Sequence, residues 1–366
     1  MAPAFEAQER VFAPAFAILS QAIADHAFPG AAVAVVSEGK LVALRGVGRF
    51  TYEADSPSVT AETIFDLASV SKVVGTTTMA MLLYQHGHLD LDVPVAGIIP
   101  EFAKGDRRRQ EVTIRMLLAH SSGLPAYIQL YRQAHTRDEL LQAALAVPLA
   151  ADPDARTEYS DIGFIILGAA LERIADEPLD RFCQHEVFGP LGMHHTTYCP
   201  PPHLRANIPP TQDDREFRGR IIQGEVQDEN ASVMGGVAGH AGIFSNAADL
   251  AAFAHCMLQG GRPILRPDTV ELFTRRHAGS SRALGWDTPS PPSQSGKYFS
   301  PRSFGHLGYT GTSLWIDPER QVAVALLTNR TWPDKKSQLI KQVRPRFHDA
   351  VIEALEGQGA DLERHE

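Results

Sequence analysis

The chain contains little cysteine, no long hydrophobic run and no excess of positive charge. Three cysteines occur in 366 residues, at positions 183, 199 and 256, and no C-x-x-C pair is present. An odd, scattered set of this kind does not predict a disulfide scaffold or a zinc site. No segment has 18 consecutive uncharged apolar residues, so we expect no transmembrane helix and no membrane partner. The net charge of −9 argues against nucleic acid as a partner.

Motifs of several other enzyme classes are absent as well. The chain has 15 histidines, but none forms an H-E-x-x-H pattern. The pairs His86/His88 and His194/His195 lie in turn-like or polar contexts. We therefore expect no metal and no cofactor. A G-x-S-x-G elbow is missing too, so the sequence does not support an α/β-hydrolase.

The N-terminus has an apolar stretch at residues 11–19 that is long enough for a short signal-peptide core. The ten residues before it carry two glutamates and one arginine, whereas an export signal is positively charged there. Apolar side chains recur at helical spacing through this region, at Phe12, Phe16, Leu19 and Ile23. We expect an amphipathic helix packed on a sheet, and a cytoplasmic protein.

The tetrad Ser69-Val70-Ser71-Lys72 stands at the head of an apolar run, residues 73–83, that predicts a buried helix. Positions i and i+3 share a helix face, so Ser69 and Lys72 can touch. A serine hydroxyl becomes a nucleophile when a neighbouring base activates it. The tetrad alone is weak evidence, and by itself it favours Ser69 as a helix cap and Lys72 as a solvated residue.

Two further motifs follow in order. Tyr159-Ser160-Asp161 precedes an apolar helix, and His306-Leu307-Gly308 opens a strand-like stretch. S-x-x-K, S-D-N and K-T-G form one set in serine β-lactamases and penicillin-binding proteins. With these motifs the chain resembles the serine β-lactamase-like hydrolases, which include class C β-lactamases, D-Ala-D-Ala carboxypeptidases, family VIII-type esterases and related peptidases. The resemblance covers nearly the whole chain.

Strand patterns lie at both ends of the chain. Residues 31–36 and 41–45 predict two strands around a turn, and residues 312–316 and 322–328 predict a second pair. Between them, residues 69–231 are mainly helical and loop, with no convincing run of alternating strands. The fold class is therefore α/β (α+β). The resemblance implies an antiparallel sheet flanked by helices, with an inserted all-α domain.

We expect residues 1–68 and 234–366 to form the α/β sheet domain and residues 69–233 the inserted helical domain. The active site should lie at their junction, where pockets are common. Segments 199–230 and 287–302 are rich in proline and predict loops without helices or strands. Long loops in compact domains are either passive connections or substrate walls, and both alternatives stay open.

The resemblance implies a role for each motif residue. Ser69 is the nucleophile, Lys72 is its closest activator, and Tyr159 shuttles protons together with the lysine. Gly308 lies in the substrate-binding strand. The backbone N–H groups of Ser69 and Tyr309 form the implied oxyanion hole.

Asp161 departs from the family pattern, because many relatives have asparagine there. An ionised carboxylate only accepts hydrogen bonds, whereas an amide also donates. Asp161 should pair with Lys72 and raise the pKa of that lysine. This favours either Tyr159 as the working base or Asp161 as a structural anchor, and the sequence does not decide between them.

His306 and Leu307 are a second departure. His306 stands where K-T-G has lysine, and a histidine can donate one hydrogen bond without a fixed charge. Leu307 lacks the hydroxyl that threonine or serine would offer to a substrate carboxylate. Both changes weaken the interpretation as a β-lactam hydrolase.

The function predicted from these motifs is a serine hydrolase that cleaves an ester or small amide through an acyl-enzyme intermediate. A true β-lactamase or a D-Ala-D-Ala carboxypeptidase is the alternative with the same mechanism, and an acyltransferase differs only in the second acceptor. A non-catalytic penicillin- or peptidoglycan-fragment-binding protein is the alternative from another class. The expected partner is a small ester, amide or β-lactam-like substrate. No sequence feature indicates an oligomeric state.

Overall fold

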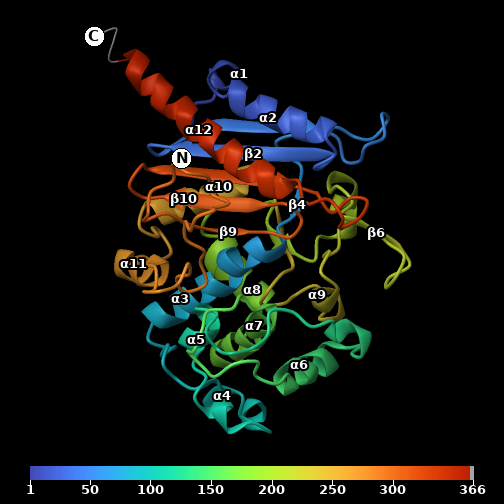
Figure 1. The fold of residues 1–366 in the computed structure, drawn as a ribbon, viewed down its shortest axis with the longest axis vertical. Helices are drawn as coiled ribbons and strands as arrows, with labels where there is room; N and C mark the ends of the chain where they lie inside the picture. The colour runs from blue at the N-terminus through green and yellow to red at the C-terminus, as the bar shows by residue number, and fades with distance from the viewer. Residues whose placement is uncertain (363–366) are drawn as a thin grey trace.

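A six-stranded sheet forms the upper half of the molecule in Figure 1, where the computed structural model describes residues 1–362. Its strand order is β1-β3-β2-β11-β10-β9. The strands are β1 (Ala2–Pro3), β3 (Lys40–Gly48), β2 (Gly30–Ser37), β11 (Val322–Thr328), β10 (Ser313–Asp317) and β9 (Phe304–Leu307). All neighbours pair antiparallel except the two-residue β1, which runs parallel to β3. The four predicted strands are confirmed, within three residues of their predicted ends.

Helices cover both faces of this sheet: α2 (Ala13–Ala24) and α12 (Ile340–Leu362) on one side, α10 (Ala247–Leu258) on the other. Successive strand residues point to opposite faces. In β2, Val33 and Val35 join the core under α2 and α12, whereas Ala32 and Ala34 join the core on the α10 side. A strand that is buried on both faces needs this near-continuous apolar sequence. The predicted fold class, a sheet flanked by helices, is confirmed.

The predicted N-terminal amphipathic helix is present as α2, next to the short α1 (Gln8–Val11). Phe12, Phe16 and Leu19 are buried in the core that α2 shares with α12, and Ile23 is half-buried. Within the described residues, no helix combines the length and the apolar character needed to cross a membrane.

The lower half of the molecule in Figure 1 is mainly helical. Its helices are α3 (Thr78–Gln85), α4 (Val95–Ile98), α5 (Ile114–Leu118), α6 (Arg137–Ala146), α7 (Asp161–Ala175), α8 (Leu179–Cys183) and α9 (Glu229–Val233), and α11 (Pro267–Thr274) packs against α3. The centre of this layer is α7, in which every residue of 162–171 is buried. Because α7 is apolar all round, neighbouring helices must surround it.

Two small sheets depart from the sequence expectations. One joins β4 (Phe65–Asp66), β8 (Ile243–Ser245) and β5 (Thr197–Tyr198). The other is a hairpin, β6 (Gln212–Asp214) with β7 (Arg220–Ile222), so the prediction that 199–230 has no element of its own is wrong. A buried ion pair between Arg218 and Asp214 holds this hairpin at 2.7 Å. Its strands are too short to show hydrophobic alternation, and tertiary contacts stabilise them instead. Segment 287–302 contains no helix or strand, as predicted.

Candidate active site

Ser69 lies in a 3-10 helix, Ala68–Val70, and a π-helical turn, Lys72–Thr77, separates it from α3. The sequence predicted one regular helix here. Thr78 instead donates its hydroxyl hydrogen to the Val73 carbonyl at 2.7 Å, which competes with the regular backbone ladder. Single π turns in α-helices often mark functional sites. Ser69 and Lys72 nevertheless meet, with Lys72 Nζ 2.9 Å from Ser69 Oγ.

Asp66 holds the strained backbone just before Ser69. Ala68 has a left-handed φ of 47°, which costs free energy for any residue with a Cβ. Its N–H donates to Asp66 Oδ1 at 2.8 Å, and the Gln227 N–H donates to Asp66 Oδ2 at 2.7 Å. Burial raises the pKa of Asp66 to about 6, although the two N–H donors oppose this. No sequence motif points to Asp66, because Gln227 is 161 residues away in the sequence.

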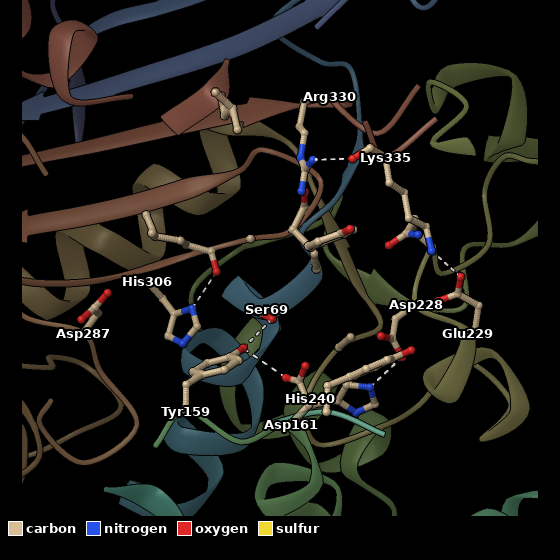
Figure 2. A pocket seen from close by; sticks show the side chains of 18 of the residues that line it. Ser69, Tyr159, Asp161, Asp228, Glu229, His240, Asp287, His306, Arg330 and Lys335 are labelled. Carbon is tan, nitrogen blue, oxygen red and sulfur yellow. Dashed lines mark hydrogen bonds and ion pairs between the residues drawn. The ribbon is translucent and has the colours of Figure 1, made fainter. Parts of the chain in front are cut away.

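Four predicted site residues, Ser69, Lys72, Tyr159 and Asp161, meet in one hydrogen-bonded cluster. Figure 2 shows Ser69, Tyr159 and Asp161 of this cluster. Tyr159 Oη lies 2.8 Å from Ser69 Oγ and 3.1 Å from Asp161 Oδ1. Lys72 Nζ lies 2.6 Å from the same Asp161 oxygen, so the predicted pairing of these two residues is present. Lys72 also donates to the His240 carbonyl at 2.9 Å. The cluster joins the nucleophile turn, the start of α7 and the loop before β8.

Burial sets the electrostatics of this cluster. It lowers the pKa of Lys72, which is fully buried, and the Asp161 carboxylate opposes that shift. Burial raises the pKa of Tyr159 well above its usual value, and the charge of Asp161 raises it further. Tyr159 is therefore a neutral phenol at every physiological pH.

Ser160 and His120 fix where α7 begins. The Ser160 hydroxyl accepts the Gly163 N–H at 3.0 Å, as an N-cap does. The Ser160 N–H donates to His120 Nδ1 at 3.0 Å, and the His120 ring lies against both Tyr159 and Phe164. Burial holds the pKa of His120 well below its usual value, so the ring stays a neutral acceptor. His120 thus positions Tyr159 and Asp161.

The loop after β9 is tied to the nucleophile turn. Thr310 donates to the Asp66 carbonyl at 2.9 Å and Thr312 donates to the Leu67 carbonyl at 2.8 Å. Within the described residues, neither the Ser69 N–H nor the Tyr309 N–H has a hydrogen-bond acceptor. Two free N–H groups beside the nucleophile are the arrangement that an oxyanion hole requires.

Gly308 permits this close approach. A Cβ at position 308 would overlap the Thr312 side chain and would lie 2.6 Å from the Leu67 carbonyl oxygen. The Gly308 N–H also donates to the Thr312 carbonyl at 2.7 Å. Any side chain at this position would push the loop that carries Tyr309 away from Ser69.

His306 is buried, with 2% of its surface exposed, and its ring faces Tyr159 at 6.0 Å between centroids. Its Nδ1 lies 2.8 Å from the Leu307 carbonyl, which can only accept, so the proton is assigned to Nδ1. Burial holds the pKa of His306 well below its usual value. The ring is therefore neutral and supplies no cation where the K-T-G motif has lysine.

Asp228 and His240 form a pair that the sequence motifs did not reveal. Asp228 Oδ1 lies 2.7 Å from His240 Nε2, and Asp228 also accepts the Ala231 N–H at the start of α9. Burial works against ionisation of Asp228, but His240, the Ala231 N–H and Lys72 together outweigh it, and the pKa of Asp228 falls to about 2. The glycine-rich stretch around His240 was visible in the sequence, whereas its acidic partner was not.

A cavity of about 720 Å³ opens over Ser69. The predicted site residues Ser69, Tyr159, Asp161, His306 and Tyr309 line it. Four basic residues line it as well: Arg330 and Lys335 from the segment after β11, and Lys341 and Arg344 from α12. The cavity is large enough for a drug-sized or dipeptide-sized molecule. Among the side chains that the structure describes, no group of three or more His, Cys, Asp or Glu could hold a metal ion.

Comparison with known proteins agrees with this geometry. The family model described as Beta-lactamase matches residues 15–344. The chain is 33% identical over 344 residues to an N-acetylmuramyl-L-alanine amidase of Bacillus subtilis (strain 168), covering 83% of this chain and 77% of the relative. It is 32% identical over 306 residues to a protein of Escherichia coli (strain K12) named as a D-alanyl-D-alanine carboxypeptidase, covering 74% and 70%.

Solved structures share the fold. EstCE1, a hydrolase with promiscuous acyltransferase activity, superposes with a TM-score of 0.77 at 23% identity, over 94% of this chain and 99% of that one. A class C β-lactamase of Rhodobacter sphaeroides gives a TM-score of 0.72 at 22% identity, over 93% and 99%. Members of this group act on small β-lactam, peptide or ester substrates. The family match along most of the chain, together with a hydrogen-bonded Ser-Lys pair, makes this protein a member of the β-lactamase family, a serine hydrolase that works through an acyl-enzyme intermediate.

Proposed function

We propose that this protein hydrolyses a small amide of the kind that links an acyl group to an amino acid in peptidoglycan fragments, with Ser69 as the nucleophile. The observation that carries the proposal is the contact of Ser69 Oγ with both Lys72 Nζ and Tyr159 Oη. The names of relatives that are 32–33% identical, an amidase and a carboxypeptidase, support an amide as the substrate. We place the site at the junction of segments 1–68 and 234–366 with segment 69–233.

The proton that leaves Ser69 needs an acceptor, and Lys72 is a poor candidate for it. Its ammonium has three N–H groups, and three acceptors surround it: Ser69 Oγ, the His240 carbonyl and Asp161 Oδ1. An ammonium whose donors are all satisfied has no lone pair to offer. In this proposal Lys72 acts as a fixed positive charge that stabilises the developing alkoxide of Ser69.

Tyr159 passes the proton on. Burial and Asp161 hold the pKa of Tyr159 well above its usual value, so a tyrosinate base is unfavourable. As a phenol, Tyr159 can accept the Ser69 proton while it gives its own proton to Asp161 Oδ1, 3.1 Å away. Asp161 is then the final acceptor in the resting enzyme. This gives a function to the carboxylate that stands where S-D-N has asparagine.

The reaction follows from that relay. Ser69 Oγ forms a bond to the carbonyl carbon, and its proton moves through Tyr159 to Asp161. The N–H groups of Ser69 and Tyr309 hold the oxyanion. The proton then returns through Tyr159 to the leaving nitrogen as the C–N bond breaks. Water adds to the acyl-enzyme by the same route and releases the acid and free Ser69.

A substrate panel with intact-mass detection tests the proposal. N-lactoyl-L-alanine, a p-nitrophenyl acetate ester and a chromogenic cephalosporin would be compared side by side. We expect turnover of the amide, a mass increase from a fluorophosphonate on the peptide that contains Ser69, and a loss of about a thousandfold or more in Ser69→Ala. Full activity of Ser69→Ala would refute the nucleophile assignment. Binding without turnover of any substrate would instead favour a non-catalytic fragment-binding protein.

A further inference from the structure

Arg282 lines the cavity over Ser69 and lies against the ring of Tyr159. Its guanidinium carbon is 5.2 Å from the centroid of that ring, within the distance of about 6 Å at which a cation and an aromatic face attract each other. The side chain is 18% exposed. Within the described residues its guanidinium donates no hydrogen bond, and the one carboxylate within 4.0 Å is that of Asp287, at 3.7 Å. The charge of Arg282 is therefore only loosely paired.

The backbone on both sides of Arg282 fixes its place. The Arg282 N–H donates to Ser280 Oγ at 3.0 Å, and the same oxygen accepts the Thr157 hydroxyl at 3.1 Å. Further along the chain, the backbone of Asp287 exchanges two hydrogen bonds with Gly305 of β9, at 2.8 and 2.9 Å. The segment that carries Arg282 is thus tied both to the residues before α7 and to the sheet. A guanidinium without a close partner is held at the site by these backbone contacts.

The charges around Tyr159 come from several parts of the chain. The groups whose side chains approach its ring or hydroxyl are Ser69 and Lys72 of the nucleophile turn, Asp161 of α7, His120, His306 of β9, and Arg282. Burial holds the pKa of both His120 and His306 well below the usual value, so neither ring is a cation. Lys72 is a cation, but a carboxylate binds it at 2.6 Å. Among the described residues, Arg282 is the cation near Tyr159 that lacks so close a counter-charge.

The proposed relay needs such a cation. Tyr159 gives its proton to Asp161 while it takes the proton of Ser69, and its oxygen gains negative charge as the two protons move. Burial and the charge of Asp161 oppose that charge, and both raise the pKa of Tyr159. Arg282 acts in the opposite direction and lowers the pKa of Tyr159. A fixed charge that is already in place stabilises the transition state without reorganisation.

We propose that Arg282 acts through Tyr159 as a positioning residue, and that its fixed charge stabilises the phenol oxygen while the proton of Ser69 passes to Asp161. No bond to Arg282 forms or breaks in this step. The inference rests on the proposed relay and adds to it the residue that makes proton transfer through a buried phenol favourable. Arg282 supplies near Tyr159 the positive charge that the neutral His306 ring does not.

Charge-changing variants give the first test. The quantity to measure is kcat/KM for p-nitrophenyl acetate, because it reports the acylation of Ser69 whatever the natural acyl group is. Arg282→Gln should lower it by about 5- to 30-fold, the range expected for the loss of one partly buried cation–π contact. Arg282→Lys should keep most of the rate. Arg275→Gln removes an exposed arginine outside the cavity and should match the wild type. An unchanged rate in Arg282→Gln would overturn the inference.

Chemical rescue separates charge from packing. Arg282→Ala leaves an opening in the wall of the cavity that a small planar molecule can enter. Millimolar guanidinium chloride should restore part of the lost rate, whereas urea, which has the same shape without the charge, should not. Sodium chloride at equal ionic strength is the control. Equal rescue by urea, or no rescue by guanidinium together with an inactive Arg282→Lys, would overturn the role of the charge.

The pH–rate profile gives a reading that a structural role would not change. Burial lowers the pKa of Lys72, Asp161 and Asp228 raise it, and the charge of Arg282 lowers it further. Arg282→Gln therefore raises the pKa of Lys72, and the ammonium that the mechanism requires persists to higher pH. The alkaline limb should move to higher pH even though the rate at neutral pH falls. A lower rate with an unmoved limb would mean that Arg282 only supports the loop.

A double-mutant cycle separates this inference from the proposed function. If Arg282 acts through the phenol, Arg282→Gln should cost little in the Tyr159→Phe background, so the two losses should not add. Equal losses from Arg282→Gln in both backgrounds would overturn the inference and leave the relay through Tyr159 intact. A Tyr159→Phe variant with the wild-type rate would instead refute the relay itself.

Discussion

Lys72 Nζ lies 2.6 Å from Asp161 Oδ1, and Lys72 is fully buried. The S-D-N motif has an amide at this point, which would leave the lysine with a weaker partner. In this chain the carboxylate is acceptor for both Lys72 and Tyr159. Removing one partner of a buried ion pair leaves an uncompensated charge, which is strongly unfavourable. The position of Asp161 therefore offers the most direct test of the proton route.

Asp161→Asn should lower kcat/KM by about 100- to 1,000-fold near neutral pH, because the relay loses its final acceptor. Loss of the negative charge lowers the pKa of Lys72, so the lysine amine becomes the remaining base. The acidic limb of the pH–rate profile should then move to higher pH, since Lys72 must lose a proton before Ser69 can react. A limb that moves to lower pH with the rate retained would make Lys72 the base of the wild-type enzyme.

Tyr159→Phe should reduce kcat by about 100-fold or more, because the phenol connects Ser69 to Asp161. The substrate KM should change little, since the ring itself remains. Tyr84→Phe is a suitable control, because Tyr84 packs against Phe273 and does not line the cavity. Steady-state kinetics on both variants measures kcat and KM. Equally small losses of kcat in the two variants would show that the Tyr159 hydroxyl has no role in proton transfer.

Asp66 should make folding stability depend on pH in an unusual direction. Its pKa is raised to about 6 in the folded protein, against about 4 in an unfolded chain. Between these values the folded state binds more protons, so the contribution of Asp66 falls as pH rises from about 4 to about 6 and remains unfavourable above that. Asp66→Asn should remove this component, which is on the order of 2–3 kcal/mol.

Urea unfolding at pH 4.5 and at pH 7 checks this prediction. The change in unfolding free energy between the two pH values should differ between Asp66→Asn and the wild type, with the variant losing less stability on going to pH 7. Asp55→Asn, which removes an exposed carboxylate, should follow the wild type. If the unfolding free energy changes by the same amount between pH 4.5 and pH 7 in all three proteins, Asp66 does not titrate in this range.

Gly308→Ala should cost about 1–3 kcal/mol of stability through overpacking against Thr312 and Leu67, and it should reduce kcat because Tyr309 follows directly. Gly357→Ala is the matched control. Gly357 lies in α12 with no described atom within 4 Å of the added Cβ, so alanine there should stabilise the helix by up to about 1 kcal/mol. Chemical unfolding together with kcat measures both effects. Full activity of Gly308→Ala would exclude the close approach described here.

The sequence alone determined the family, the fold class and the four main strands. Strand alternation and helical spacing are local patterns, so residues 31–36 and 322–328 showed their structure without their partners. The spacing of Ser69 and Lys72 likewise predicted their contact, because one helical turn joins them. The role of Asp161 was open in the sequence, since either an anchor or a proton acceptor fits a carboxylate at that position.

Only the tertiary structure decided how the site is held. Lys72 is bound by a carbonyl 168 residues away, and Leu67 accepts from Thr312 across 245 residues. No local pattern encodes such contacts, because hydrophobic periodicity reports which face is buried and not what it meets.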